Sequence, residues 1–146
     1  NRVESFAVLN SVIAGNAGFG IVVNGFFTGN GAADVTIRNV TVRANGNDGL
    51  VFRGDANDVT VDRAIVAEND GSGIRFAFND LTDVTVVDSN VRNNADLGVE
   101  RATGFFDSGN VAVQGCFFAD NGNEVSDGVD QSGTRTSPVP NAGASI

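Results

Sequence analysis

The sequence predicts an all-β fold, a single-stranded right-handed parallel β-helix of about five rungs with three short strands per rung. Three observations support this prediction: a repeat of nearly constant period, apolar residues that alternate within each repeat, and turns built from Asn and Gly. The repeats are about 25 residues long and open at Phe6, Val35, Val59, Val84 and Val111. A period of this size is typical of stacked units that bury their apolar faces only against their neighbours.

The elements of one rung follow in order. In the second repeat Val35 and Ile37 alternate with polar residues, and Val42 follows after a short polar turn. Val, Ile and Thr at period two favour strands over helices. A Gly–apolar pair predicts the third strand, at Gly20-Ile21, Gly49-Leu50, Gly73-Ile74, Gly98-Val99 and Gly128-Val129. The extra residues of the last rung, within 123–127, are expected to lie in a turn.

Stacking places equivalent residues about 4.8 Å apart in columns. An inward aliphatic column is expected from the five residues that open the repeats. An asparagine column is expected at one turn, because stacked amides bond from rung to rung and Asn tolerates the left-handed conformation of a tight corner. Its members are Asn16, Asn45, Asn69, Asn94 and Asn121.

Charged side chains are expected to pair across neighbouring rungs on the outer surface, where such pairs help modestly and penalise a register slip. The expected pairs are Arg38 with Asp62, Arg63 with Asp88, and Arg75 with Glu100.

Arg101 departs from its inward column, which otherwise holds Val23, Phe52, Phe76 and Gln131. An Arg at such a position is costly unless it is paired. Either the strand ends before it, or it pairs with Glu100 or Asp130.

Composition excludes several classes of function. The chain has 18 acidic and 9 basic residues and a net charge of −9, and it contains no His. All the basic residues are Arg, and no basic stripe is present, so we expect no nucleic-acid partner. No apolar run approaches the ~18–20 residues of a membrane span, so we expect no membrane insertion. Cys116 stands alone in an apolar stretch and predicts a core thiol.

Domain organisation is expected to be simple. Residues 1–131 predict the β-helix, and the Ser/Gly/Pro-rich residues 132–146 predict an exit segment, a linker or an end strap. The chain opens without Met and is soon inside a repeat, so we interpret it as a segment of a longer protein.

Two insertions interrupt the repeat at the same turn, and insertions of this kind often carry function. Both begin with Gly-Phe-Phe and continue to a Gly-Asn pair. Their Phe side chains either stack on sugar rings or dock a partner chain, or they fold back as an apolar lid along the coil. The candidate ligand-binding residues are Phe26, Phe27, Phe105, Phe106 and Asp107.

A column of carboxylates, Asp34, Asp58 and Asp83, precedes three of the repeats. Asx side chains at such positions commonly cap a turn. The alternative is a metal site, with calcium as the ion, because hard cations favour clusters of oxygen ligands. We expect no other cofactor.

The rung pattern x-[DN]-V-T-V…V-x-x-N…G-[ILV] resembles that of the pectin-lyase-like superfamily over about residues 3–131, and it is similar to the rungs of mannuronan epimerase-type proteins. The resemblance implies the fold. The epimerases' catalytic Tyr and His do not carry over, because the chain contains neither residue. Tailspike-type hydrolases use Asp/Glu pairs on the flank of the coil, for which Glu68, Asp70 and Asp96 are the candidates here.

We therefore expect a non-catalytic structural or glycan-binding β-helix module of an extracellular, cell-surface or virion-fibre protein. The alternative is a fragment or divergent member of a polysaccharide-active enzyme, either a lyase, an epimerase or a glycosidase. The expected partner is a polysaccharide or another protein chain. The uncapped first rung indicates continuation by more chain or by another subunit, as in a homo-oligomer.

Overall fold

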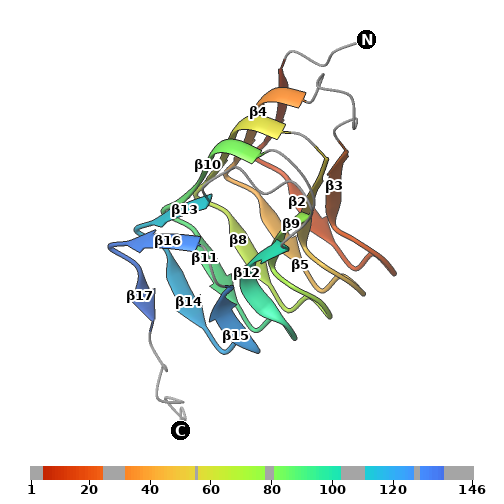
Figure 1. Cartoon of the computed structure of the whole chain (residues 1–146). Helices are drawn as coiled ribbons and strands as arrows, with labels where there is room; N and C mark the ends of the chain where they lie inside the picture. Colours follow the sequence, from red (N-terminus) through yellow and green to blue (C-terminus); the bar gives the residue numbers. More distant parts are fainter. Residues whose placement is uncertain are drawn as a thin grey trace, which may run out of the picture.

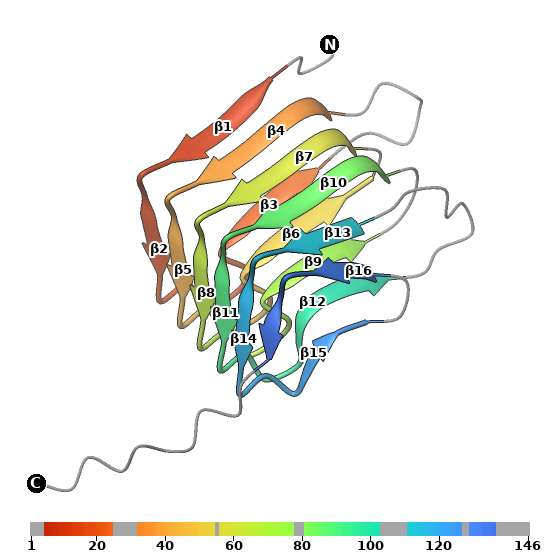
Figure 2. The same cartoon turned by 90° about the vertical axis from the view of Figure 1, so that its left-hand side faces the viewer.

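The computed structural model describes residues 5–24, 32–54, 56–77, 81–102, 111–126 and 129–136, which form a coil of parallel strands with three faces (Figures 1 and 2). Each complete turn of the chain adds one strand to each of three parallel sheets. The predicted all-β coil with three strands per rung is therefore confirmed. Among the described residues, no helix is long and apolar enough to cross a membrane.

Sheet A contains the strands that open the repeats: β1 (Phe6–Leu9), β4 (Ala32–Arg38), β7 (Ala56–Asp62), β10 (Leu81–Val87), β13 (Val111–Gln114) and β16 (Val129–Ser132). Sheet B follows in the chain: β2 (Val12–Ala14), β5 (Thr41–Arg43), β8 (Ile65–Ala67), β11 (Asn90–Arg92), β14 (Phe117–Ala119) and β17 (Arg135–Thr136). Sheet C completes each turn: β3 (Ile21–Asn24), β6 (Leu50–Arg53), β9 (Ile74–Ala77), β12 (Leu97–Ala102) and β15 (Asn123–Val125).

The register advances by one repeat per turn, so the repeated apolar positions become columns of the core. The aliphatic column is confirmed: at most 1% of each of its four Val residues is exposed, and these are Val35, Val59, Val84 and Val111. Phe6 pairs with Val35 but is 39% exposed, because β1 is the first strand of its sheet. Burying each such side chain stabilises the fold by roughly 1.5–3 kcal/mol.

The asparagine ladder is confirmed atom by atom. Nδ2 of each Asn donates to Oδ1 of the Asn in the next rung, over 3.0 Å from Asn16 to Asn45, 2.9 Å from Asn45 to Asn69, 2.8 Å from Asn69 to Asn94 and 2.9 Å from Asn94 to Asn121. The three central members are at most 2% exposed. Each backbone N–H of the first four members also donates to the next Oδ1. The ladder therefore runs in one direction along the coil.

The left-handed corner residue is not the ladder asparagine, and this part of the prediction is wrong. The positive φ angles belong to the residue before each ladder member: Gly15 (71°), Ala44 (53°), Glu68 (58°), Asn93 (55°) and Asp120 (53°). A backbone bond to the next rung holds this residue, as in Ala44, whose N–H donates to the carbonyl of Ala67 at 3.1 Å. The stacking of the rungs imposes the conformation even on residues that disfavour it.

Two of the three expected ion pairs are present. Arg38 Nε lies 2.8 Å from Asp62 Oδ2, and Arg75 Nε lies 3.4 Å from Glu100 Oε2. Arg63 pairs with the adjacent Asp62 at 3.2 Å and not with Asp88. The Arg38 and Arg63 side chains are half exposed, so each of their pairs adds little stability.

The last rung is built differently from the prediction. Leu97 pairs with Asn123 and Val99 with Val125, so 123–125 is a strand and not a turn. Glu124-Val125 thus takes the place of the Gly–apolar pair, whereas Val129 opens β16 and pairs with Val111. The prediction of Gly128-Val129 as the fifth pair is wrong, because the preceding turn is one residue shorter than in the other rungs.

Arg101 lies within β12, which continues to Ala102, so the strand does not end before it. It pairs with Phe76, while Gln131 pairs with Val113 in another sheet, so the two residues do not share a column. The backbone N–H of Arg101 donates to Ser126 Oγ at 2.7 Å. At the end of the coil β17 pairs with β14, so strand pairing extends past residue 131.

Candidate functional site

The candidate ligand-binding residues Phe26, Phe27, Phe105, Phe106 and Asp107 lie outside the described residues. Their segments connect β3 to β4 and β12 to β13 in the chain. In the chain, both segments follow a strand of sheet C and precede a strand of sheet A. Their role in ligand binding stays a prediction.

The Asp column lies at the start of sheet A. Asp34, Asp58 and Asp83 are exposed and have positive φ angles of 57°, 52° and 53°. The pairing of β4 with β7 passes from Ala33↔Asn57 to Val35↔Val59, so each Asp forms a left-handed bend within its strand. Asp tolerates this bend better than most residues. In the described part of the chain, no group of three or more Cys, Asp or Glu side chains could hold a metal ion.

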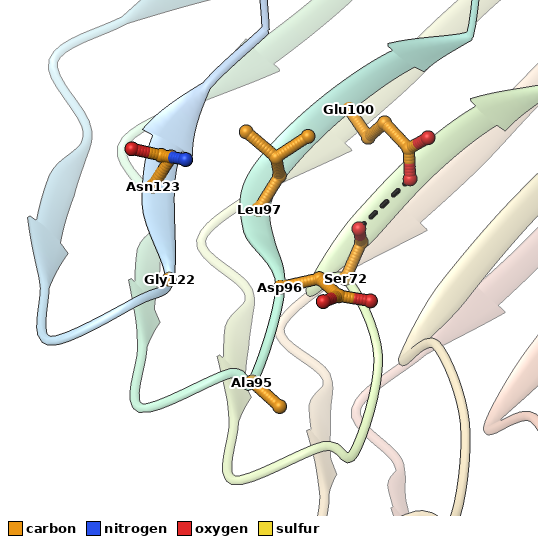
Figure 3. A pocket seen from close by; sticks show the side chains of 7 residues that line it. All are labelled: Ser72, Ala95, Asp96, Leu97, Glu100, Gly122 and Asn123. Carbon is orange, nitrogen blue, oxygen red and sulfur yellow. Dashed lines mark hydrogen bonds between the residues drawn. The ribbon is translucent and has the colours of Figure 1, made fainter.

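A hollow of about 320 Å³ lies at another corner, where sheet B passes into sheet C. The sequence did not predict it. Figure 3 shows how the side chains from three successive turns surround it. Its lining residues are Ser72, Ala95, Asp96, Leu97, Glu100, Gly122 and Asn123.

Glu100 is held at the hollow by two neighbours. Ser72 Oγ donates to Glu100 Oε2 at 2.8 Å (Figure 3), and Arg75 Nε lies 3.4 Å from the same oxygen. Ser72 comes from the turn before β9, and Arg75 lies within β9, one rung before Glu100. The Glu100 carboxylate is therefore held by side chains of the preceding rung and not by residues of its own strand.

A buried carboxylate supports this arrangement from the preceding rung. Asp48 Oδ1 accepts the backbone N–H of Ser72 at 2.7 Å, and Asp48 Oδ2 lies 3.6 Å from Arg75 Nη1. The exposed fraction is 3% for the Asp48 side chain and 22% for that of Glu100. The Arg75 guanidinium lies between two carboxylates and offsets their repulsion. With Asp96 at the rim, the site keeps a net negative charge.

The polar lining can bind hydroxyl groups. The carboxylates accept hydrogen bonds, while the Asn123 amide both donates and accepts. The chain contains no His, the side chain that ordinarily exchanges protons near neutral pH, and it contains no Lys or Tyr.

Sequence reasoning found parts of this site without joining them. Asp96 was a hydrolase candidate, and it lines the hollow, whereas Glu68 and Asp70 do not. The Arg75–Glu100 pair was interpreted as a surface ion pair. The sequence signal was the position before the repeated Gly, which is polar at Asp48 and Ser72. The structure buries both residues, at 2% and 1% exposed.

Cys116 does not belong to the site. Its thiol is 1% exposed in the core, and Sγ donates to the carbonyls of Val86 and Gln114 at 3.4 Å. Burial raises the pKa of this thiol above its ordinary value. It is the predicted core thiol and a poor nucleophile.

Comparison with known proteins agrees with the fold. A family model described as a right-handed β-helix region matches residues 4–141. The chain belongs to this family. No match was found among curated protein sequences.

One solved structure shares the fold clearly. It is a mutant of the periplasmic alginate epimerase AlgG, with 15% sequence identity and a TM-score of 0.73. The match covers 90% of this chain and 33% of that one, so the chain spans about a third of the epimerase's length. The fluoroquinolone resistance protein QnrB1 aligns at 11% identity, over 92% of each chain, with a TM-score of only 0.17. The likeness to AlgG supports the predicted resemblance to epimerase-type rungs at the level of fold.

Proposed function

We propose that this chain is a non-catalytic glycan-binding β-helix module of an extracellular or cell-surface protein. The observation that carries the proposal is the hollow between sheets B and C, where Ser72, Asp96, Glu100 and Asn123 line one concave surface. Convergent polar groups in a concavity are the usual means of orienting a small polar ligand.

Preorganisation supports this use of the hollow. Glu100 accepts a hydrogen bond from Ser72 and forms an ion pair with Arg75. The backbone N–H of Ser72 in turn donates to the buried Asp48. Side chains held in this way lose little conformational freedom when a ligand binds, so more of the interaction energy appears as affinity. Rungs that stack on both sides keep the backbone of the site rigid.

The charge of the site selects the class of glycan. Asp96 and Glu100 present carboxylates, Arg75 is shared between Glu100 and Asp48, and the whole chain has a net charge of −9. Acidic polysaccharides such as alginate would be repelled. The ligand proposed for the hollow is therefore a neutral glycan whose hydroxyls donate to these carboxylates. The likeness to a periplasmic protein supports a location outside the cytoplasm.

The test is a glycan array followed by calorimetry on the best neutral oligosaccharide. The double variant Asp96→Asn/Asn123→Ala is expected to weaken binding about tenfold or more, because it removes a charged and a neutral hydrogen-bonding group. The matched control is Asp70→Asn, which changes an exposed carboxylate in the equivalent turn of the preceding rung. Preferential binding of alginate fragments, or equal loss in both variants, would contradict the proposal.

A second candidate function is a polysaccharide-active enzyme of which this chain is a part. The fold shared with an alginate epimerase favours it. A reducing-end assay and proton NMR on neutral and uronic-acid polymers separate the two candidates. Turnover by this chain would replace the binding proposal with the enzymatic one.

A further inference from the structure

Asp48 is the one buried charged residue in the described part of the chain, at 2% exposed. It occupies the position before the repeated Gly, where other rungs carry Phe19, Ser72 and Leu97. The scaffold therefore accepts uncharged side chains at this position. A carboxylate that is withdrawn from water costs stability unless its partners compensate for the lost solvation. A costly residue that the scaffold does not need points to a function.

The neighbouring rung leaves room for the Asp48 carboxylate. A Cβ at Gly71 would collide with Asp48 Oδ1 and would lie 2.9 Å from the backbone nitrogen of Asp48. Oδ1 accepts the backbone N–H of Ser72 at 2.7 Å. Oδ2 has no hydrogen-bond partner among the described residues, and it lies 3.6 Å from Arg75 Nη1. The interaction that Oδ2 makes is therefore the ion pair with Arg75.

Arg75 lies between two carboxylates of the neighbouring rungs. Its Nη1 pairs with Asp48 of the preceding rung, and its Nε lies 3.4 Å from Oε2 of Glu100 in the next rung. The Arg75 side chain is 38% exposed, yet it does not line the hollow. Its Nε is buried and has no hydrogen-bond partner in the described part of the chain, so the guanidinium has bonding capacity that it does not use. The two carboxylates determine where this cation lies.

The charge beside the hollow depends on Asp48. The carboxylates of Asp48 and Glu100 and the guanidinium of Arg75 together leave one negative charge, and Asp96 adds another at the rim. Without the charge of Asp48, Arg75 would neutralise Glu100, and its Nη1 would lack an anionic partner. A guanidinium in that state binds a carboxylate strongly, because its planar N–H groups match the two carboxylate oxygens. Glu100 both lines the hollow and pairs with Arg75, so the freed guanidinium would lie next to a ligand-contacting side chain.

We propose that Asp48 is a specificity-determining residue of the hollow, because its hold on Arg75 Nη1 keeps the guanidinium away from the ligand and limits the site to uncharged sugars. This inference rests on the proposed glycan-binding function. Asp48 acts through Arg75 and not by touching the ligand, so it is a positioning residue. When its charge is removed, the hollow admits sugars that carry a carboxylate.

The test compares two trisaccharides that differ only at C6, β-1,4-linked mannotriose and the corresponding mannuronate trisaccharide. NMR titration measures the affinity of each for the 146-residue chain and for Asp48→Asn, which keeps an oxygen for the Ser72 N–H and removes the charge. Asp48→Asn is expected to bind the mannuronate trisaccharide about tenfold more tightly than the unchanged chain does, because Arg75 gains a charged partner in the ligand. The affinity for mannotriose is expected to change little.

Two further variants separate the role of Asp48 from a general effect of charge. Asp70→Asn removes an exposed carboxylate from the turn before Ser72 and changes the net charge of the chain equally, so it is expected to leave mannuronate binding unchanged. The double variant Asp48→Asn/Arg75→Gln is expected to lose the gain, because it lacks the guanidinium. The NMR signal of the Arg75 Nε–H is expected to shift in Asp48→Asn and not in Asp70→Asn. Circular dichroism checks that each variant is folded.

The inference is supported by a gain in mannuronate binding that occurs in Asp48→Asn alone and disappears in the double variant. No gain, an equal gain in Asp70→Asn, or a gain that survives Arg75→Gln would each overturn it. Failure of the proposed function is a different result, namely that the unchanged chain binds no neutral glycan. The mannuronate comparison decides the role of Asp48 in either case, since it does not depend on binding of the neutral sugar.

Discussion

The first and last described turns of this coil differ in the polarity of their inward positions, which no further described rung covers. At the first turn the inward positions stay apolar, as in Val8, Ile13 and Ile21, and they pack on the core while partly exposed. At the last described turns the Val8 column becomes polar at Gln131 and the glycine column becomes polar at Glu124, while the Ile21 column stays apolar at Val125. A terminal repeat with a polar outer surface is what a stacked fold needs in order to remain soluble. The last described turn has a polar residue at Gln131, whereas the first described turn has Val8 in the same column.

The asparagine ladder gives the sharpest test of this difference, because its bonds run in one direction. Asn69→Ala is expected to cost about 2–5 kcal/mol, since it leaves the buried N–H and Nδ2 of Asn45 without their acceptor. Asn121→Ala removes the acceptor of Asn94 in the same way and is expected to cost about 2–3 kcal/mol. Asn16→Ala removes one bonded donor, Nδ2, at an exposed position and is expected to cost under about 1 kcal/mol.

Urea unfolding of the three variants at one low protein concentration measures these differences. The order Asn69, Asn121, Asn16 matters more than the absolute values, since all three substitutions remove the same atoms. Equal costs at Asn16 and Asn121 would show that the direction of the bonds does not decide the stability of the ends.

The glycine column allows a second comparison, between an interior rung at Gly73 and the last described rung at Glu124. A Cβ at Gly73 would lie 2.7 Å from Val91 Cγ1 and 2.8 Å from both Asn94 Nδ2 and the carbonyl oxygen of Gly98. Gly73→Ala is therefore expected to destabilise the chain by about 1–3 kcal/mol. Glu124 occupies the equivalent position, and Glu124→Ala is expected to change the stability little.

Thermal unfolding of the two Ala variants checks this contrast, with a difference in Tm of roughly 2–10 °C expected for a chain of this length. At Gly20, Gly49 and Gly73 the atoms that exclude a side chain belong to a Val, an Asn and a Gly of the next rung. At Gly98 they belong to Phe118 and Glu124. If Glu124→Ala proved as damaging as Gly73→Ala, the last rung would have to be packed as tightly as the interior ones.

Much of the fold could be predicted from the sequence, because equivalent positions in successive rungs carry the same residue type and meet the same packing or hydrogen-bonding requirement. The Val column, the Asn ladder and four of the five Gly–apolar pairs were all correct. The prediction was wrong at the last rung, where the spacing of the repeat changes. The fifth Gly–apolar pair was predicted at Gly128, whereas Glu124 occupies that position in the structure.

The left-handed corner was misplaced for a related reason. Its column contains Ala44 and Glu68, which carry no sequence signal for positive φ, because backbone bonds between rungs impose the angle. The hollow was missed because its residues come from three rungs and repeat no pattern. Equivalent positions that repeat in every rung predict the scaffold, but no repeated position links Asp96 with Glu100, which the structure brings to one surface.

The raised pKa of Glu124 leads us to expect a small dependence of folding stability on pH that arises in the last described rung. Burial raises the pKa of this carboxyl above its ordinary value of 4.5, and its Oε2 is buried without a hydrogen-bond partner. The folded state therefore binds the proton more tightly than the unfolded state. The stability from this group is fully present below pH 4.5 and is lost as the pH rises through the raised pKa.

Glu124→Gln is accordingly expected to raise Tm by roughly 1–2 °C at neutral pH, because it removes a partly desolvated charge. The gain is expected to vanish below the ordinary pKa of the carboxyl, where both side chains are neutral. Melting curves of the two proteins across this range measure the difference, and Asp130→Asn, at an exposed position of the same end, is the control. A gain that persisted in acid would mean that the introduced amide stabilises the end by packing, so the charge of Glu124 would not be what distinguishes it.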